Sequence, residues 1–501
     1  MRRTNSAATS SAISIPGTAR SSRRRVRRST WRRRIVSASG NMRVLFTTLP
    51  GYGHFQPIVP LARALQRAGH VVTVATAPAF AEVVGRAGLS FIPAGLDWDE
   101  SRLIETLPEI AREKTEYQGE WLMRRIFLDR SPRHMVPDLM AAAAEWRPDV
   151  IVSGTYEFGG ALAAELLGLP YASCSISFRW NRWILKNVAG RSIARLRRSL
   201  GLPRDQRLTA FGRYLDLCFV PPSWALTDAL LRPELTQMVR RKTFGRGVSL
   251  HQRAVGLRAL ARQRLLALDH RLRPEHAAVG PTTHFIGNGE ADGPIDPLPV
   301  WWTNLPERPT VYVSLGTVFS AQYPQVFETI LAGLRDQPLN LILTVGRDVD
   351  PARFGPQPAS VRIERFIPPG TLAAILPHIS LCISHAGFGT VMDALSHGVP
   401  LVLLPLSADQ PVIAQSCFVN GVAPDLPADV WRVSAKGLPI IMPDGLTPKV
   451  IRDAATTVLS EPRFRHSAKA ASDEIANLPG LSQGIDLLAA TVASEAIPKV
   501  Y

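Results

Sequence analysis

The chain has 501 residues, of which 46% are apolar and 20% charged, a composition typical of a globular protein with two or three domains. No apolar run approaches the ~20 residues that a membrane-spanning helix needs, and the four cysteines lie far apart without metal-ligand spacing. These features exclude an integral membrane protein, argue against a disulfide framework and favour a reduced, cytoplasmic protein.

Residues 1–41 differ from the rest of the chain, because they hold eleven arginines and no acid. No apolar segment follows the arginines, so a secretory signal is not expected. The segment is predicted to be a basic disordered tail, and a nucleic-acid or membrane arm is the other interpretation of such a charge run. The folded part is expected to begin at Met42, with a first strand at 44–48.

Short apolar segments alternate with helical patterns after Met42. Expected strands lie at 44–48, at 71–75 and from 91, with expected helices at 58–68 and 80–87. Alternation at this spacing predicts parallel βαβ units, and therefore an α/β, Rossmann-like first domain at 42–292.

A glycine-rich turn at 50–57 follows the first strand and carries His54. Open parallel sheets bind ligands at the carboxyl ends of their strands, so His54 is expected to face a cleft. An unperturbed imidazole titrates near about 6.5, which suits a general base at neutral pH. A turn histidine that caps the following helix is the alternative interpretation.

The middle of the chain, residues 179–275, is strongly basic, with 21 Lys and Arg against six Asp and Glu. Its charge favours either an acidic ligand or a peripheral contact with an anionic membrane, although solvated helix faces would give the same composition. No nucleic-acid-binding module surrounds the charges, so a nucleic-acid partner is not expected. Aromatic residues in and beside this segment favour a pocket for an apolar small molecule: Phe178, Trp180, Trp183, Phe211, Tyr214, Phe219 and Trp224.

A breaker-rich linker is expected at 293–309, followed by a second Rossmann-like domain at 310–485 and a C-terminal tail at 486–501. The strand expected at 310–315 ends in Gly316 and Thr317, a second strand-end turn that faces a ligand in such sheets. Further strands are expected at 339–345, 361–366 and 379–383, and helices at 326–334, 447–459 and 468–489.

The stretch 384–390 combines a buried strand end, a glycine turn and a helix start. His385 follows the strand, Gly387 and Gly389 allow a phosphate to approach the backbone, and Thr390 adds a hydroxyl donor. Free N–H groups and roughly half a positive charge at a helix N-terminus bind anions. The stretch therefore predicts a phosphate site.

The GxGHxxP turn at 51–57, the 385–390 stretch and the following Asp409-Gln410 pair together resemble the signatures of the inverting family 1 glycosyltransferases. The resemblance is closest to the actinobacterial enzymes that glycosylate macrolides and related natural products, and it runs from Met42 to the C-terminus. It implies the GT-B fold of the UDP-glycosyltransferases, in which two Rossmann-like domains face a cleft.

The resemblance implies donor-binding roles in the second domain. Asp393 falls on a carboxylate that hydrogen-bonds the ribose. Asp409 and Gln410 fall on a pair that holds sugar hydroxyls, although an Asp at a helix start is also a common cap. Phe366 stands where the family usually has a Trp that stacks on the base, and Pro369 replaces a Gln.

In the resembled family the histidine at the position of His54 deprotonates the acceptor hydroxyl. Many relatives orient it with an aspartate from a later strand end, but here that position is Gly154. Glu157 is the nearest alternative carboxylate and a candidate catalytic residue. A favourable acid in the first turn of the next helix is its other interpretation.

The expected function is transfer of a hexosyl group from a UDP- or dTDP-sugar to a hydroxyl of a small, apolar natural-product acceptor, with inversion and without metal or other cofactor. The nucleotide sugar is a co-substrate. A nucleotide-sugar epimerase of GT-B fold is one alternative, against which the GxGHxxP turn and the Asp-Gln pair argue. A non-catalytic GT-B partner protein is the other, and Gly154 and Pro369 leave it open.

Overall fold

The computed structural model of the chain describes residues 40–113, 118–119, 121–175, 182–205, 208–224, 233–244, 248–272, 280–287, 295–316, 320, 322–406, 409–427, 430–433, 439–441 and 445–494. Nearly all of the expected basic tail, 1–41, lies outside these residues. No helix among them is long and apolar enough to cross a membrane.

The first domain is built on a seven-stranded parallel sheet in the order β3-β2-β1-β4-β5-β6-β7. The chain enters at β1, moves outward through β2 and β3, and then crosses to β4 on the other side of β1. The strand order therefore reverses between β1 and β4. The strands are β1 (Arg43–Thr47), β2 (Val71–Thr76), β3 (Ser90–Pro93), β4 (Val150–Gly154), β5 (Tyr171–Ser175), β6 (Leu215–Cys218) and β7 (Thr283–Phe285).

Helices cover the first sheet, which explains why its central strands β1 and β4 are buried along nearly their whole length. In α2, for example, Leu61, Ala62 and Leu65 form one buried face against the sheet. The helical segments are α1 (Tyr52–Phe55), α2 (Val59–Arg67), α3 (Ala81–Arg86), α4 (Leu103–Thr106), a π-helical segment (Leu122–Arg130), α6 (Ser131–Trp146), α7 (Gly159–Leu167), α8 (Arg182–Ser199), α10 (Pro233–Phe244) and α11 (Leu250–Leu272).

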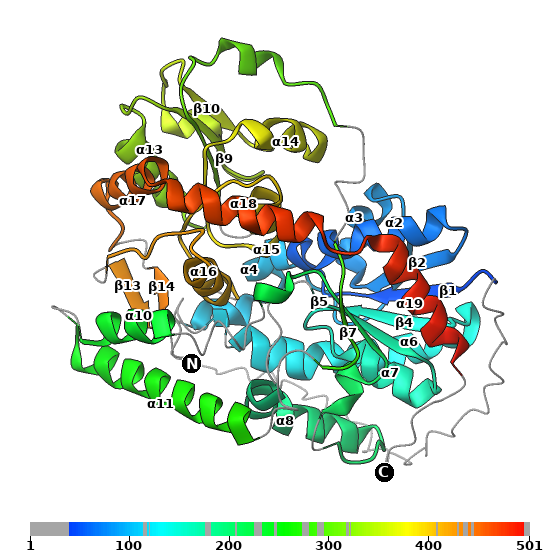
Figure 1. The fold of residues 1–501 in the computed structure, drawn as a ribbon. Coiled ribbons are helices and arrows are strands. Elements are labelled where there is room, and N and C mark those ends of the chain that lie inside the picture. Colours follow the sequence, from blue (N-terminus) through cyan, green and yellow to red (C-terminus); the bar gives the residue numbers. More distant parts are fainter. Residues whose placement is uncertain are drawn as a thin grey trace, which may run out of the picture.

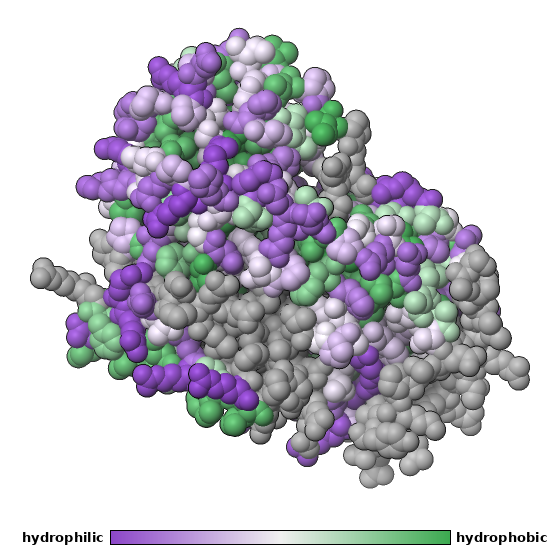
Figure 2. Space-filling model, in the orientation of Figure 1, coloured by the Kyte–Doolittle hydropathy of each residue, from purple (hydrophilic) through white to green (hydrophobic). Residues whose placement is uncertain are grey.

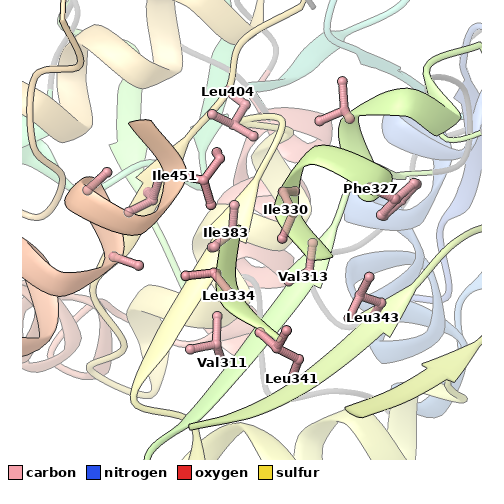
Figure 3. Packing of buried hydrophobic residues seen from close by; sticks show 14 of the residues in the cluster. Val311, Val313, Phe327, Ile330, Leu334, Leu341, Leu343, Ile383, Leu404 and Ile451 are labelled. Carbon is pink, nitrogen blue, oxygen red and sulfur yellow. The ribbon is translucent and has the colours of Figure 1, made fainter. Parts of the chain in front are cut away.

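The second domain repeats the topology with five parallel strands in the order β10-β9-β8-β11-β12, and its order reverses between β8 and β11. Figure 3 shows its core, where Val313, Leu343 and Ile383 from the sheet point toward Ile330 and Ile451 of the covering helices. The strands are β8 (Thr310–Ser314), β9 (Asn340–Thr344), β10 (Val361–Glu364), β11 (Leu381–Ser384) and β12 (Leu401–Leu403), with a separate antiparallel pair β13 (Trp431–Val433) and β14 (Pro439–Ile441).

The helices of the second part of the chain are α13 (Pro324–Leu334), α14 (Pro369–Ile375), α15 (Phe388–Ser396), α16 (Gln410–Val419), α17 (Pro448–Ser460), α18 (Pro462–Ala476) and α19 (Leu481–Ala493). The expectation of two Rossmann-like domains is thus confirmed. The four cysteines, all among the described residues, are buried and form no disulfide, which agrees with their interpretation as small core residues: Cys174, Cys218, Cys382 and Cys417.

The last two helices connect the domains. In Figure 1, α18 runs from the second domain toward the first, and α19 lies against the first sheet and α2. The expected tail at 486–501 is therefore wrong in its described part, because α19 continues to Ala493. The reason is that Leu488 and Val492 extend the apolar face of α19 and join the first domain's core.

The contact between α19 and the first domain is tight at Gly484. A Cβ at this position would lie 2.9 Å from Ile286 and 3.6 Å from Leu61. We therefore expect Gly484→Val to lower the free energy of unfolding by about 1–3 kcal/mol, because the larger side chain overpacks the contact between α19 and the first domain. Thermal unfolding monitored by circular dichroism would measure this.

Gly85 is the matched control, since it lies inside α3 and a Cβ there would meet no atom within 4 Å. Gly85→Ala should leave the melting temperature unchanged or raise it, because Ala has the higher helix propensity. Equal melting temperatures for both variants would show that α19 is not seated tightly on the first domain.

Candidate functional site

Each sheet has a point where its strand order reverses, and the candidate site residues lie at these two points. His54 follows β1 and Glu157 follows β4, while Gly316 follows β8 and His385 follows β11. At such switch points the connections on either side leave in opposite directions, so a crevice remains at the strands' carboxyl ends. Thr317 lies outside the described residues.

His54 is held in a short helical turn rather than in an irregular loop. The expected turn at 50–57 is corrected here, because α1 already begins at Tyr52, directly after the extended Gly51. The N–H of His54 donates to the carbonyl of Gly51 at 3.1 Å, and the neighbouring Phe55 is completely buried. Core packing of Phe55 therefore fixes the direction of the imidazole.

The imidazole of His54 is enclosed by aromatic rings and one carboxylate. Phe127 and Tyr156 meet it edge-on, with ring centroids 5.9 and 6.1 Å away. Its Nε2 lies 3.7 Å from Oε1 of Glu100. Burial lowers the pKa of His54, but the carboxylates of Glu100 and Asp409 outweigh burial, so the pKa lies above its ordinary value.

Glu157 is buried, and its carboxylate accepts hydrogen bonds from nearby hydroxyl and backbone N–H groups. Its Oε2 accepts from the hydroxyls of Thr47, at 2.6 Å, and Ser153, at 3.2 Å. It also accepts from the N–H groups of Gly159, at 2.6 Å, and Gly160, at 2.8 Å, in the first turn of α7. Glu157 precedes the N-cap residue of α7, so it is not itself in the first turn, but its carboxylate binds the N–H groups at the helix start. Burial raises its pKa despite these bonds.

Glu100 is the carboxylate that the sequence analysis did not single out. It begins a 3-10 turn after β3, far from the GxGHxxP turn in the sequence, and its N–H donates to the carbonyl of Pro50 at 2.9 Å. No local pattern marks this residue, because its contact with His54 depends on the packing of two loops from different strands.

The aromatic residues around His54 also differ from those expected. Trp98, Phe127 and Tyr156 form one group, in which Phe127 stacks on Tyr156 with centroids 6.2 Å apart. Of the residues expected in the pocket, Phe219 and Trp224 are instead buried in hydrophobic cores. Phe178 and Trp180 lie outside the described residues, as does the side chain of Trp183.

His385 is seated between two glycines that come from different loops. A Cβ at Gly316 would lie 2.7 Å from the His385 ring, and one at Gly387 would lie 2.4 Å from its Nε2. Ala386 adopts a left-handed conformation, with a φ of 66°, to make this turn. Burial lowers the pKa of His385 to about 4, so the ring is neutral at pH 7.

The start of α15 is open where a phosphate is expected. Gly387 is the extended N-cap residue, and a Cβ at Gly389 would meet no atom within 4 Å. Thr390 is half-buried in the same turn. Asp393, one turn further on, reaches solvent but has protein on most sides, and this loss of hydration raises its pKa to about 6.

The remaining predicted donor residues lie on neighbouring loops. Asp409 precedes α16 and Gln410 is its first residue, with Oε1 accepting from the N–H of Leu406 at 2.8 Å. Gln410 thus also stabilises its own loop, as a cap would. Phe366 is 64% exposed after β10, which leaves its ring available for stacking.

Contacts between the domains bring the two halves of the site together. Phe388, the first residue of α15, packs against the hydrophobic clusters of both domains. Arg347 donates to the hydroxyl of Tyr52 at 3.5 Å, and the charge of Asp409 raises the pKa of His54 across the cleft. These contacts and the charge of Asp409 place the loop that carries His54 beside the second domain.

Comparison with known proteins agrees with this architecture. Two family descriptions match the chain: "Erythromycin biosynthesis protein CIII-like, N-terminal domain" over residues 63–238 and the corresponding C-terminal domain over residues 330–483. Among curated proteins, the chain is 29% identical to 4'-demethylrebeccamycin synthase of Lentzea aerocolonigenes, covering 89% of this chain and 98% of that protein. It is 25% identical to demethyllactenocin mycarosyltransferase of Streptomyces fradiae, over 89% and 85%.

Solved structures show the same fold. CalG4, the calicheamicin glycosyltransferase, matches with a TM-score of 0.64 at 20% identity, covering 91% of this chain and 99% of that one. The glycosyltransferase VinC, solved with dTDP, matches with a TM-score of 0.61 at 22% identity, over 90% and 99%. The chain therefore belongs to the erythromycin biosynthesis protein CIII-like family of natural-product glycosyltransferases, which have the GT-B fold.

Proposed function

We propose that this glycosyltransferase moves a sugar from a nucleoside diphosphate to a hydroxyl of a small natural-product acceptor, with His54 as the general base. Nε2 of His54 takes the proton of the acceptor hydroxyl while that oxygen attacks the anomeric carbon. The bond between this carbon and the diphosphate oxygen breaks, and the configuration at the carbon inverts. The observation that carries the proposal is that the charge of Asp409, in the second domain, acts on His54, while Phe388 at the start of α15 packs against both domains.

The leaving diphosphate is proposed to bind at the start of α15. The unbonded N–H groups of the first turn, the Thr390 hydroxyl and the helix dipole meet its developing charge. Neutral His385 contributes one further hydrogen bond. These groups act without a metal or other cofactor, so the expected absence of both is retained as part of the proposal.

The remaining contacts to the sugar donor are proposed residue by residue. Phe366 stacks on a uracil or thymine base, and Asp393 holds the ribose. Asp409 and Gln410 contact sugar hydroxyls beside His54, and Gly316 and Thr317 border the diphosphate. Demethyllactenocin mycarosyltransferase and CalG4 are named as transferases, which does not favour an epimerase or a non-catalytic partner. A cytoplasmic location is likewise proposed.

His54→Ala should lower turnover by roughly 10²- to 10⁴-fold while donor binding changes little, because the variant loses only the proton acceptor. Turnover would be measured with UDP- and dTDP-glucose and a panel of hydroxylated macrolides and polycyclic aromatics. His466→Ala is the control, since His466 is exposed on α18. Wild-type turnover in His54→Ala would remove His54 from the mechanism.

Substitutions at two glycines with different surroundings test the diphosphate site. Gly387→Ala should displace the His385 ring, because the new Cβ would lie 2.4 Å from Nε2. Gly389→Ala meets no protein atom within 4 Å, so it should keep the wild-type melting temperature and obstruct only a bound phosphate. His385→Ala should weaken diphosphate binding by about one to two powers of ten, since charge-assisted hydrogen bonds contribute about 1.5–3 kcal/mol.

The measurement is calorimetric titration of each folded variant with UDP and with dTDP. We expect all three variants to bind the preferred nucleotide more weakly than wild type does. Gly85→Ala again serves as the control. Wild-type affinity in Gly389→Ala and His385→Ala would place the diphosphate elsewhere in the cleft.

We also propose that the basic middle segment, 179–275, contacts an anionic membrane through α11. Among the described residues, α11 exposes leucines at positions 250, 257, 265, 268 and 272, which are between 51% and 84% exposed. Their spacing places them on one helix face. The opposite face carries Ala259 and Leu260, which pack against Phe418 of α16.

Arginines flank the exposed leucines of α11. In Figure 2, green and purple side chains lie together along the edge where Figure 1 places α10 and α11. A helix with an apolar face and a basic rim lies in the headgroup region of anionic bilayers, to which each basic residue contributes about 1 kcal/mol. The positive charge of these arginines therefore favours an anionic lipid surface as the partner of this face of α11. The exposed arginines are Arg253, Arg258, Arg264 and Arg271.

Vesicle sedimentation tests this contact. The full chain should bind vesicles of phosphatidylglycerol and phosphatidylcholine but not phosphatidylcholine alone. Replacing Leu257, Leu265 and Leu268 by Gln should abolish binding at an unchanged melting temperature, whereas Ile104→Gln, an equally exposed control at 53%, should not. Unchanged vesicle binding in the triple variant would reject the surface, and loss of self-association instead would assign it to a second copy.

A further inference from the structure

We propose that Glu100 is the positioning residue of His54: its carboxylate orients the imidazole and stabilises the imidazolium that forms when the acceptor proton is transferred. This inference rests on the proposed role of His54 as the base. It assigns to a loop after β3 the task for which the position after β4, Gly154, has no side chain. Glu100 is not a catalytic residue in the strict sense, because it acts through His54.

The geometry of Glu100 and His54 supports a direct contact between their side chains. Oε1 of Glu100 lies 3.7 Å from Nε2 of His54, and the two side chains are only 17% and 12% exposed. At this distance, away from bulk water, an opposite charge stabilises a protonated imidazole much more than it would in solution. The contact is made to Nε2, the nitrogen that takes the acceptor proton, so Glu100 acts on the protonated ring through its charge and its hydrogen bond.

The backbone holds Glu100 in place. Its N–H donates to the carbonyl of Pro50 at 2.9 Å, which ties the loop after β3 to the turn that carries His54. Asp99 accepts from both the N–H and the hydroxyl of Ser101, at 2.8 and 2.7 Å, and thereby fixes the start of the 3-10 turn. Glu100 is therefore presented to His54 by a defined turn.

Gly51 makes room for the carboxylate. A Cβ at Gly51 would lie 2.0 Å from Oε2 of Glu100, a distance that no side chain tolerates. The φ of Gly51 is −150°, an extended value that any residue adopts, so its backbone does not require glycine. The space that Glu100 occupies is thus the structural reason for a glycine at this point of the GxGHxxP turn.

The other groups around His54 do not take this role. Glu157 is held by donors from Thr47, Ser153 and the start of α7. Asp409, from the second domain, acts on His54 only through its charge and is proposed to contact the sugar. Phe127 and Tyr156 are uncharged rings, and the backbone of Thr155 adds a smaller effect. Glu100 is the carboxylate nearest to Nε2 among the described residues.

The test compares four variants of the full chain: Glu100→Gln, Glu100→Asp, Gly51→Ala and Glu105→Gln. Glu105 lies on the same stretch but is 62% exposed and paired with Arg102, so it is the matched control. The measurement is kcat/KM against pH, with dTDP-glucose and the acceptor from the panel that gives the highest turnover. Melting temperature and dTDP affinity show that each variant is folded.

Glu100→Gln should lower kcat/KM on its plateau by roughly tenfold to a hundredfold, the loss expected when a reacting group is misaligned. Because a base must be deprotonated, activity rises with pH through the pKa of His54. Removing the negative charge lowers this pKa, so the acid limb of the profile should move to lower pH. A merely structural residue would lower activity without moving the limb.

Glu100→Asp keeps a carboxylate, so its kcat/KM and its acid limb should lie between those of Glu100→Gln and wild type. Glu105→Gln should match wild type in both. Gly51→Ala should reproduce both effects of Glu100→Gln, because its Cβ displaces the carboxylate. The double variant Gly51→Ala/Glu100→Gln should be no worse than either single one, since both changes remove the same contact.

The outcomes separate this inference from the proposed function. If Glu100→Gln keeps the wild-type rate and limb while His54→Ala loses turnover, His54 remains the base and the inference about Glu100 is wrong. If His54→Ala also keeps turnover, the proposed mechanism itself fails. A lowered rate with an unmoved acid limb would make Glu100 a structural residue only.

Discussion

The site depends first on a property of parallel sheets, the crevice that remains where the strand order reverses. The reversal lies between β1 and β4 in the first sheet and between β8 and β11 in the second. His54 and His385 each follow one of these strands within a few residues. Topology therefore places both histidines at the carboxyl ends of the sheets, where the strand order reverses, and side-chain contacts refine their positions.

Two of the four described non-glycine residues with a positive φ lie at these same points. Tyr156 follows β4 with a φ of 69°, and Ala386 follows β11 with a φ of 66°. For residues other than glycine such conformations cost about 1–3 kcal/mol, and they persist only when the surroundings hold them. Ala386 is completely buried, and Tyr156 stacks on Phe127. These two turns place His385 directly after β11 and the ring of Tyr156 beside His54 and Phe127.

The sequence predicted those parts of the molecule that depend on local patterns. The strands β1 to β3 and β8 to β11, the helices α2, α3, α13 and α17, and the placement of His54 and His385 after strands follow from apolar periodicity and from glycine turns. Bounds for β4 to β7 and for the helices between them were not predicted from the sequence. The sequence did not predict Glu100 or Phe127, because their positions at the site arise from tertiary packing of a 3-10 turn and a π-helical segment. The predicted end of the second domain, at residue 485, also falls inside α19. The reason is that α19 packs against α2 of the first domain, more than 400 residues earlier in the chain.

The glycines of the two motifs have different tasks, and the difference matters for how such motifs are interpreted. At Gly51 the missing side chain makes room for Glu100, and at Gly316 and Gly387 it makes room for the ring of His385. At Gly389 no protein atom fills the space. A glycine in a binding motif is often explained by close approach of the ligand. Here that explanation suits Gly53 and Gly389, where a Cβ would meet no atom within 4 Å, because Gly51, Gly316 and Gly387 already accommodate side chains of the protein. Their substitution would reach a substrate indirectly, through the residue whose seat they form.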